Sequence, residues 1–119
     1  MRILLVLWEP NTKWHALNER EKGDYLKTLD PAIAQSRAAG MVTLGWSRVD
    51  RDLPNSPREG YLGVFGVADR AQLRELEGLI SGSQWSEYFD GTNVGMNLVG
   101  ATSREPHQVY AELLGVSLQ

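Results

Sequence analysis

The amino-acid sequence predicts an α+β fold in which helices cover an antiparallel four-stranded sheet. Three observations support this prediction. The length of 119 residues is typical of a single domain. Short apolar runs rich in β-branched and aromatic residues alternate with segments of helical periodicity. Along the chain these segments follow the order strand, helix, strand, strand, helix, strand, and a short helix comes last.

Four segments have the pattern of strands, and they span residues 3–8, 41–49, 61–68 and 91–100. The first and third are apolar at nearly every position, which indicates that both of their faces are buried. Regular alternation in the second strand would place Val42, Leu44 and Trp46 on one face. In the fourth, Asn93 and Asn97 lie on the face opposite Val94, Met96 and Leu98.

The first long helix is predicted to follow a short helical turn over residues 12–17. Asn18 and Glu21 form a capping-box pattern, and helical periodicity continues from there to about Ala39. Pro31 interrupts this segment, because it removes one backbone hydrogen bond and clashes with the preceding turn. We expect a kink at Pro31. The alternative is a new helix that Asp30 caps, with Pro31 in its first turn.

A second helix is predicted after Asp69, which is a favourable N-cap residue, and it should end near residues 81–83. Residues 84–89 carry three aromatic side chains and are expected to form a packed helical turn. A capping-box pattern from Thr102 to Glu105 predicts a terminal helix with Pro106 in its first turn. The complete order is the ferredoxin-like βαββαβ arrangement. We therefore expect residues 1–102 to form this domain and residues 103–119 to form its C-terminal helical extension.

Composition argues against several classes of function. The formal net charge is −3 and the lysines and arginines are scattered, which argues against a nucleic-acid partner. The absence of cysteine excludes disulfides and cysteine-based metal sites, and it suits the reducing cytoplasm. No apolar run is long enough to cross a membrane. The two histidines lie at opposite ends of the chain, and no cofactor motif occurs, so we expect neither a metal nor a cofactor.

The first and third predicted strands suggest a homodimer, because they are apolar on both sides. Two helices can cover one face of a four-stranded sheet, and the other face would then meet water. An apolar surface of that size is unfavourable on a monomer. Packing the sheet against the sheet of a second copy would bury it and would give a closed twofold pair.

Candidate site residues come mainly from the aromatic side chains. The four tryptophans suggest an aromatic-lined pocket for a flat, conjugated ligand, although large aromatic side chains also commonly pack in the core or at a dimer interface. The predicted ligand-binding residues are Trp8, Trp14, Trp46, Trp85, Tyr88 and Asn93.

Three further residues are candidates for catalysis. His15 follows the first strand and could act as a general acid or base, or it could simply be solvated. Arg48 shares a face with Trp46 and could bind a carboxylate or phenolate, or form an ion pair at the rim with Glu9, Asp50 or Asp52. Asn97 could contact a ligand, a neighbouring loop or the dimer partner.

The sequence resembles the dimeric α+β-barrel superfamily. More narrowly, it is similar to a group of small, uncharacterised bacterial proteins. The residues that carry the resemblance are Leu4, Val6, Leu7, Trp8, Glu9 and Pro10 at the start, Gly45 and Trp46 on the second strand, and Trp85, Tyr88 and Phe89 before the last strand. The superfamily includes cofactor-independent monooxygenases, muconolactone isomerases, polyketide cyclases and stress-induced proteins. The resemblance therefore implies a dimer and a pocket. It says little about the reaction, because one fold hosts many reactions.

Together these features predict a protein that handles small molecules in bacterial metabolism, including specialised metabolism. One hypothesis is a cofactor-independent isomerase, cyclase or monooxygenase that uses His15, Arg48 and Asn97. The alternative is a non-catalytic protein that binds a ligand for a partner enzyme. The superfamily and the tryptophans favour the first hypothesis, and the lack of a recognisable nucleophile or acid–base pair favours the second.

Overall fold

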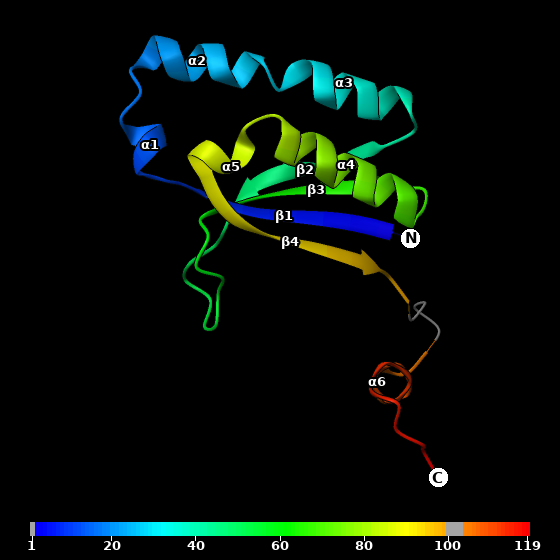
Figure 1. Ribbon diagram of the computed structural model, residues 1–119. Helices are drawn as coiled ribbons and strands as arrows, with labels where there is room; N and C mark the ends of the chain where they lie inside the picture. The colour runs from blue at the N-terminus through cyan, green and yellow to red at the C-terminus, as the bar shows by residue number, and fades with distance from the viewer. Residues whose placement is uncertain (1, 100–103) are drawn as a thin grey trace.

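The computed structural model describes residues 2–99 and 104–119 (Figure 1). Four strands and six helices occur in this part of the chain: β1 (Arg2–Pro10), α1 (Thr12–His15), α2 (Glu19–Lys27), α3 (Asp30–Ala38), β2 (Val42–Arg48), β3 (Tyr61–Val67), α4 (Arg70–Gly82), α5 (Trp85–Tyr88), β4 (Phe89–Asn97) and α6 (Pro106–Leu114). The predicted order of strands and helices is confirmed.

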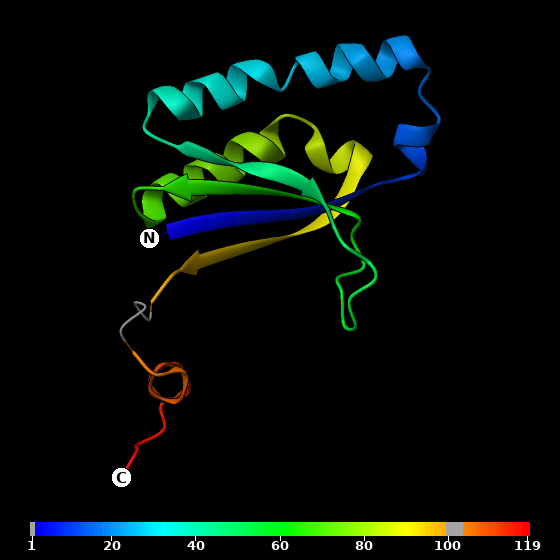
Figure 2. The same cartoon turned by 180° about the vertical axis from the view of Figure 1, so that it is seen from behind.

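The four strands form one antiparallel sheet in the order β2-β3-β1-β4. The two helical connections, α2–α3 and α4–α5, lie on the same side of this sheet (Figures 1 and 2). Trp8 on the central strand β1 pairs with Tyr61 on β3 and with Gly91 on β4. This arrangement confirms the predicted α+β, ferredoxin-like fold.

The core lies between the sheet and the helices. Alternation along β1 directs Leu4 and Val6 toward the helices, and Phe65 and Val67 on β3 share that side. Leu76 of α4 packs against them and is only 2% exposed. Leu4, at 1% exposed, occupies the centre of this cluster. The β1–β3 pair and α4 therefore provide the rigid base of the domain.

The opposite face of the sheet carries no helix in the described part of the chain (Figure 2). We call it the open face, and it presents the side chains of Ile3, Leu5, Leu7, Val42, Leu44, Leu62, Val64, Val94 and Met96. Val42 and Leu44 on the edge strand are 56% and 50% exposed. The apolar character that both sides of β1 and β3 show in the sequence is therefore present on the folded sheet.

The prediction that Trp46 shares a face with Val42 and Leu44 was wrong. Thr43 pairs with Phe65 and Gly45 pairs with the next residue, Val64, so Leu44 is an extra residue in β2. Such a β-bulge reverses the alternation beyond it. Gly45 has a φ of +151°, which a residue with a side chain rarely adopts. The bulge turns Trp46 toward the helices, on the same side as Phe65.

The predicted long helix is divided into α2 and α3, so the prediction of one helix with a kink at Pro31 was wrong. Near the end of α2 the amides of Thr28 and Leu29 donate to carbonyls three residues earlier, at 2.9 and 3.1 Å, which tightens the last turn. Helix α3 then begins at Asp30 with Pro31 in its first turn. This is close to the alternative, although Leu29 occupies the N-cap and Asp30 does not cap the helix. Pro31 costs nothing there, because first-turn amides have no partner inside the helix.

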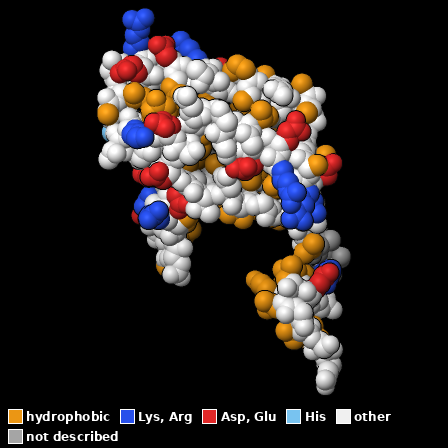
Figure 3. All heavy atoms as spheres, in the orientation of Figure 1, with side chains coloured by type: hydrophobic (Ala, Val, Ile, Leu, Met, Phe, Trp, Pro, Cys, Tyr) orange, Lys and Arg blue, Asp and Glu red, His pale blue; other side chains and the backbone are white. Residues whose placement is uncertain are grey.

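Helix α6 stands beyond the end of β4, clear of the sheet and the other helices (Figures 1 and 2). Hydrophobic side chains gather on this segment (Figure 3), where Leu113 is 64% and Leu114 is 74% exposed. Thr102, with which the predicted capping box starts, and the predicted boundary between residues 102 and 103 lie outside the described residues. No helix in the described ranges is both long and apolar enough to span a bilayer.

Two glycines provide a matched test of the pairing of β4 with β1. A Cβ atom at Gly91 would collide with the backbone carbonyl of Leu7 on β1, whereas a Cβ at Gly78 in α4 would meet open space. We expect Gly91→Ala to lower the free energy of unfolding by about 1–3 kcal/mol, and Gly78→Ala to raise it by about 0.5–1 kcal/mol. Urea unfolding followed by circular dichroism measures both. Equal effects of the two substitutions would contradict the register of β1 and β4.

Candidate functional site

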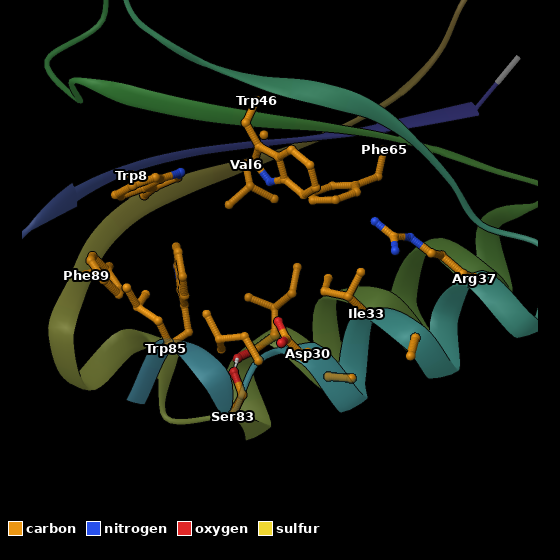
Figure 4. A pocket seen from close by; sticks show the side chains of 16 residues that line it. Val6, Trp8, Asp30, Ile33, Arg37, Trp46, Phe65, Ser83, Trp85 and Phe89 are labelled. Carbon is orange, nitrogen blue, oxygen red and sulfur yellow. Dashed lines mark hydrogen bonds between the residues drawn. The ribbon is translucent and has the colours of Figure 1, made fainter. Parts of the chain in front are cut away.

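A cavity of about 650 Å³ lies between the sheet and the helices (Figure 4). One wall is the sheet and the facing wall is formed by the α2–α3 connection, while the ends of α4 and α5 close one side. The lining residues are Val6, Trp8, Leu26, Leu29, Asp30, Ala32, Ile33, Ala34, Arg37, Trp46, Gly63, Phe65, Ile80, Ser83, Trp85 and Phe89. Most of these side chains are apolar, so the cavity is suited to a hydrophobic ligand.

Three aromatic rings form one end of the cavity. Trp8 meets Trp85 edge to face with ring centroids 5.4 Å apart, and it meets Phe89 in the same manner at 5.2 Å. Trp85 and Phe89 approach to 4.2 Å. Behind this group Trp8 stacks on Tyr61 at 4.4 Å with an interplanar angle of 15°. Because each ring contacts at least one other, this end of the cavity is preorganised for a flat π-system.

Trp46 lies where the cavity opens to solvent, and 59% of this residue is exposed. Its ring passes directly over Gly63, where a Cβ atom would come within 3.0 Å of the indole. It also meets Phe65 edge to face at 6.0 Å. The bulge at Gly45 and the missing side chain at Gly63 together allow the indole to lie across the mouth.

Three lining residues carry polar side chains, namely Asp30 and Arg37 on α3 and Ser83 after α4. Asp30, Ile33 and Arg37 are spaced three and four residues apart, which places them on one face of the helix. None of the three is among the site residues predicted from the sequence. Helical spacing places Ile33 and Arg37 on one face even in the continuous helix predicted up to about Ala39, but it does not indicate that this face lines a cavity.

An aromatic cluster of Trp14, Tyr25, Tyr88 and Phe89 joins α1, α2 and α5 beside the cavity. The centroids of Tyr25 and Tyr88 are 4.7 Å apart, and those of Trp14 and Phe89 are 4.9 Å apart. The hydroxyl of Tyr25 donates a hydrogen bond of 3.1 Å to the carbonyl of Ser83. Burial raises the pKa of Tyr25 above its ordinary value, because the phenolate would lose its hydration. Phe89 belongs both to this cluster and to the cavity wall.

The structure brings some of the predicted ligand-binding residues together and leaves others apart. Trp8, Trp46 and Trp85 line the cavity. Trp14 and Tyr88 pack in the aromatic cluster instead of lining the cavity. Their predicted role, and that of Asn93, which is exposed on the edge strand β4, remains a prediction.

The three predicted catalytic residues do not line the cavity. His15 is exposed at the end of α1, Arg48 is exposed at the end of β2, and Asn97 is exposed at the end of β4. The rim ion pair that we considered for Arg48 involves another arginine. Arg51 lies 3.6 Å from the carboxylate of Glu9, which also accepts a hydrogen bond of 2.7 Å from the amide of Gly60.

Metal-ligating side chains do not gather anywhere in the described parts of the chain. No group of three or more histidine, cysteine, aspartate or glutamate side chains there is arranged to hold a metal ion. The polar side-chain groups of the cavity lining are the carboxylate of Asp30, the guanidinium of Arg37, the hydroxyl of Ser83 and the indole N–H groups of the three tryptophans.

Comparison with known proteins identifies the family. The sequence profile of a family of unknown function (DUF6616) matches residues 1–114, so the chain belongs to this family. No curated protein matches.

Among solved structures, a heme-binding protein from Thermus thermophilus is similar over 89% of this chain, with 14% identity and a TM-score of 0.58. The chain spans less than half of that protein, 45% of its length. An antibiotic biosynthesis monooxygenase is similar over 84% of this chain and all of its own length, with 16% identity and a TM-score of 0.47. A dimeric ferredoxin-like protein of unknown function from Thermobifida fusca is 12% identical over 82% of this chain and 90% of its own, with a TM-score of 0.46. At these identities, likeness concerns the fold alone.

Tyr25 provides a pH-dependent test of the aromatic cluster. Folding raises the pKa of Tyr25 above its unfolded value, which is near 10. The contribution of this pKa shift to the free energy of unfolding is therefore complete below about pH 10. It is lost as the pH rises through the folded pKa. We expect Tyr25→Phe to lower the free energy of unfolding by about 1 kcal/mol at neutral pH. The gap between wild type and variant should narrow above about pH 10. Urea unfolding at the two pH values measures this, with exposed Tyr110 changed to Phe as the control. A gap that stays constant with pH would contradict the assignment.

Proposed function

We propose that this member of the DUF6616 family is a cytoplasmic bacterial protein that binds a flat, conjugated small molecule in the cavity between its sheet and helices. The observation that carries this proposal is the preorganised aromatic end, where Trp8, Trp85 and Phe89 meet. Trp46 at the mouth supplies a further aromatic surface. A cavity of about 650 Å³ lies within the range of roughly 300–1,000 Å³ that is typical of small-molecule sites.

The lining favours a conjugated ligand over a flexible aliphatic one. An aromatic ligand can stack on one ring and present its edge to another, which adds to the free energy of burial alone. The middle of the cavity is lined by Val6, Ile33 and Ile80, which offer apolar contacts without directional demands. A rigid planar molecule also loses little conformational entropy on binding.

The neighbour from Thermus thermophilus is a heme-binding protein, and heme is one example of a flat, conjugated ligand. Heme iron in proteins is ligated by histidine, cysteine, methionine or tyrosine. The described residues that line the cavity include none of these. Of the histidines, His15 is exposed on α1, outside the lining, and His107 is exposed on α6. The donor set does not fit heme iron, so we propose a metal-free ligand.

The presence of the Asp30 carboxylate in the cavity lining favours a second candidate function, that of a cofactor-independent isomerase, cyclase or monooxygenase. Its carboxylate lines the cavity (Figure 4) and could remove a proton from a bound keto–enol system. Mass spectrometry of a ligand recovered after incubation distinguishes the two functions. Unchanged ligand supports binding alone, and a product that Asp30→Asn no longer forms supports catalysis.

We propose in addition that the protein forms a homodimer through the open face. This face is apolar across all four strands, from Val42 and Leu44 on one edge to Val94 and Met96 on the other. Its burial against an equivalent face would remove a large apolar surface from water and satisfy a twofold arrangement.

Trp46 allows ligand binding to be tested with little risk to folding, because most of this side chain is exposed. We expect Trp46→Leu to weaken binding of a flat aromatic ligand by about threefold to tenfold, through loss of one aromatic contact. Quenching of tryptophan fluorescence and isothermal titration calorimetry with a panel of polycyclic aromatic compounds measure the affinity. Tyr110→Leu on α6 removes an exposed aromatic side chain outside the cavity and should leave the ligand affinity unchanged. If no compound in the panel produced saturable binding, the proposed function would be wrong.

Two exposed leucines offer a matched test of the dimer. Leu44 lies on the open face and is 50% exposed, whereas Leu53 lies in the loop between β2 and β3 and is 63% exposed. We expect wild type and Leu53→Arg to show the mass of two 13.3 kDa chains at micromolar concentration. Leu44→Arg should shift the equilibrium toward monomer, because it would bury an unpaired charge. Sedimentation velocity measures this. A monomeric wild type would exclude the proposed pairing.

A further inference from the structure

We propose that the ligand of this cavity carries an anionic group, and that Arg37 binds it as a carboxylate while the conjugated part of the ligand occupies the aromatic end. This inference rests on the proposed binding function and extends it to the chemical class of the ligand. Three features of the cavity support it: the direction of Arg37, the lack of a partner for its charge, and the order of polar and apolar surfaces.

Arg37 points into the cavity from the last turns of α3. Its guanidinium lies toward Phe65, and the aromatic rings of Trp8 and Phe89 lie at the opposite end (Figure 4). Ile33 lies between Arg37 and Asp30 on the same face of the helix. The cavity is therefore bordered by a cation at one end and by aromatic rings at the other.

The charge of Arg37 is not neutralised within the described parts of the chain. The salt bridges there join Lys13 to Glu87, Arg51 to Glu9 and Arg104 to Glu112, and none involves Arg37. Arg37 is an exposed residue of the lining, and the apolar walls beside it weaken the screening of its charge on the cavity side relative to bulk water. Its planar donors match a carboxylate with two parallel hydrogen bonds.

Asp30 determines the orientation of such a ligand. Its carboxylate lines the cavity two helical turns before Arg37. An anionic group placed there would be repelled by a like charge. The carboxylate of the ligand therefore belongs at the Arg37 end. A neutral hydroxyl is compatible with Asp30, because it can donate to this carboxylate, whereas the hydroxyl of Ser83 already donates to the carbonyl of Ile80 at 2.6 Å.

A flat probe with three interchangeable head groups tests this inference. We would measure the affinities of pyrenecarboxylate, the neutral pyrenecarboxamide and the cationic pyrenemethylammonium at neutral pH. The wild-type protein should bind the carboxylate about fivefold to tenfold more tightly than the amide, as expected for a partly exposed charged pair. Added salt should reduce this preference.

Variants of Arg37 assign the preference to this residue. Arg37→Gln should abolish the difference between carboxylate and amide, and Arg37→Lys should retain part of it, because lysine keeps the charge without the planar donors. Arg74→Gln, at an exposed position on α4, is the matched control and should keep the full preference. Near-ultraviolet circular dichroism and the urea midpoint confirm that each variant is folded.

The outcomes separate this inference from the function on which it rests. If none of the three probes binds, and no compound of the wider panel binds, the proposed function itself fails. If the probes bind with equal affinity, if the ammonium binds most tightly, or if Arg37→Gln keeps the preference for the carboxylate, the cavity is a binding site but the role of Arg37 is overturned.

Discussion

The aromatic contacts around Phe89 are the interaction on which the rest of the site depends. Phe89 is 4% exposed and contacts Trp8 and Trp85 on the cavity side and Trp14 and Tyr25 on the other. These contacts join α1, α2, α5 and the start of β4 to the central strand β1. Beyond this junction α3 continues across the sheet, and the small side chains of Ala32 and Ala34 face the space that remains. Large rings hold the helical layer at one end of the cavity, and these two alanines of α3 add little volume to the wall that faces the sheet.

Polar groups are placed within this apolar frame by the helices. The hydrogen bond from Tyr25 to the carbonyl of Ser83 ties α2 to the end of α4, and it satisfies a donor that burial would otherwise leave without a partner. The break before Pro31 then starts α3 at Asp30, and helical spacing brings Arg37 to the same side. A carboxylate and a guanidinium consequently border one apolar cavity without neutralising each other, which provides the asymmetry that a polar end of a ligand could recognise.

The sheet has a different requirement on each side. Toward the helices it supplies Val6, Trp8 and Phe65 to the core and the cavity. Toward the open face it presents side chains of the same apolar type that no other described element covers (Figure 2). Helix α6 adds exposed Leu113 and Leu114 outside the domain core. Burial of the apolar surface outside the cavity would therefore be favourable whether or not a ligand is bound.

The sequence alone determined the order of strands and helices, because strand and helix periodicities and N-cap residues such as Asp69 are local properties. It also identified Trp8, Trp46 and Trp85, which the structure places in one cavity. The side on which Trp46 lies depends on the tertiary structure, since a one-residue bulge at Leu44 reverses the alternation, and Gly45 by itself does not indicate which residue is the extra one. The role proposed for Arg37 likewise depends on packing, because only the position of α3 opposite the sheet makes this face of the helix a wall of the cavity. Packing brings residues that are far apart in the sequence together into one site, and the residue spacing within a single segment does not determine that packing.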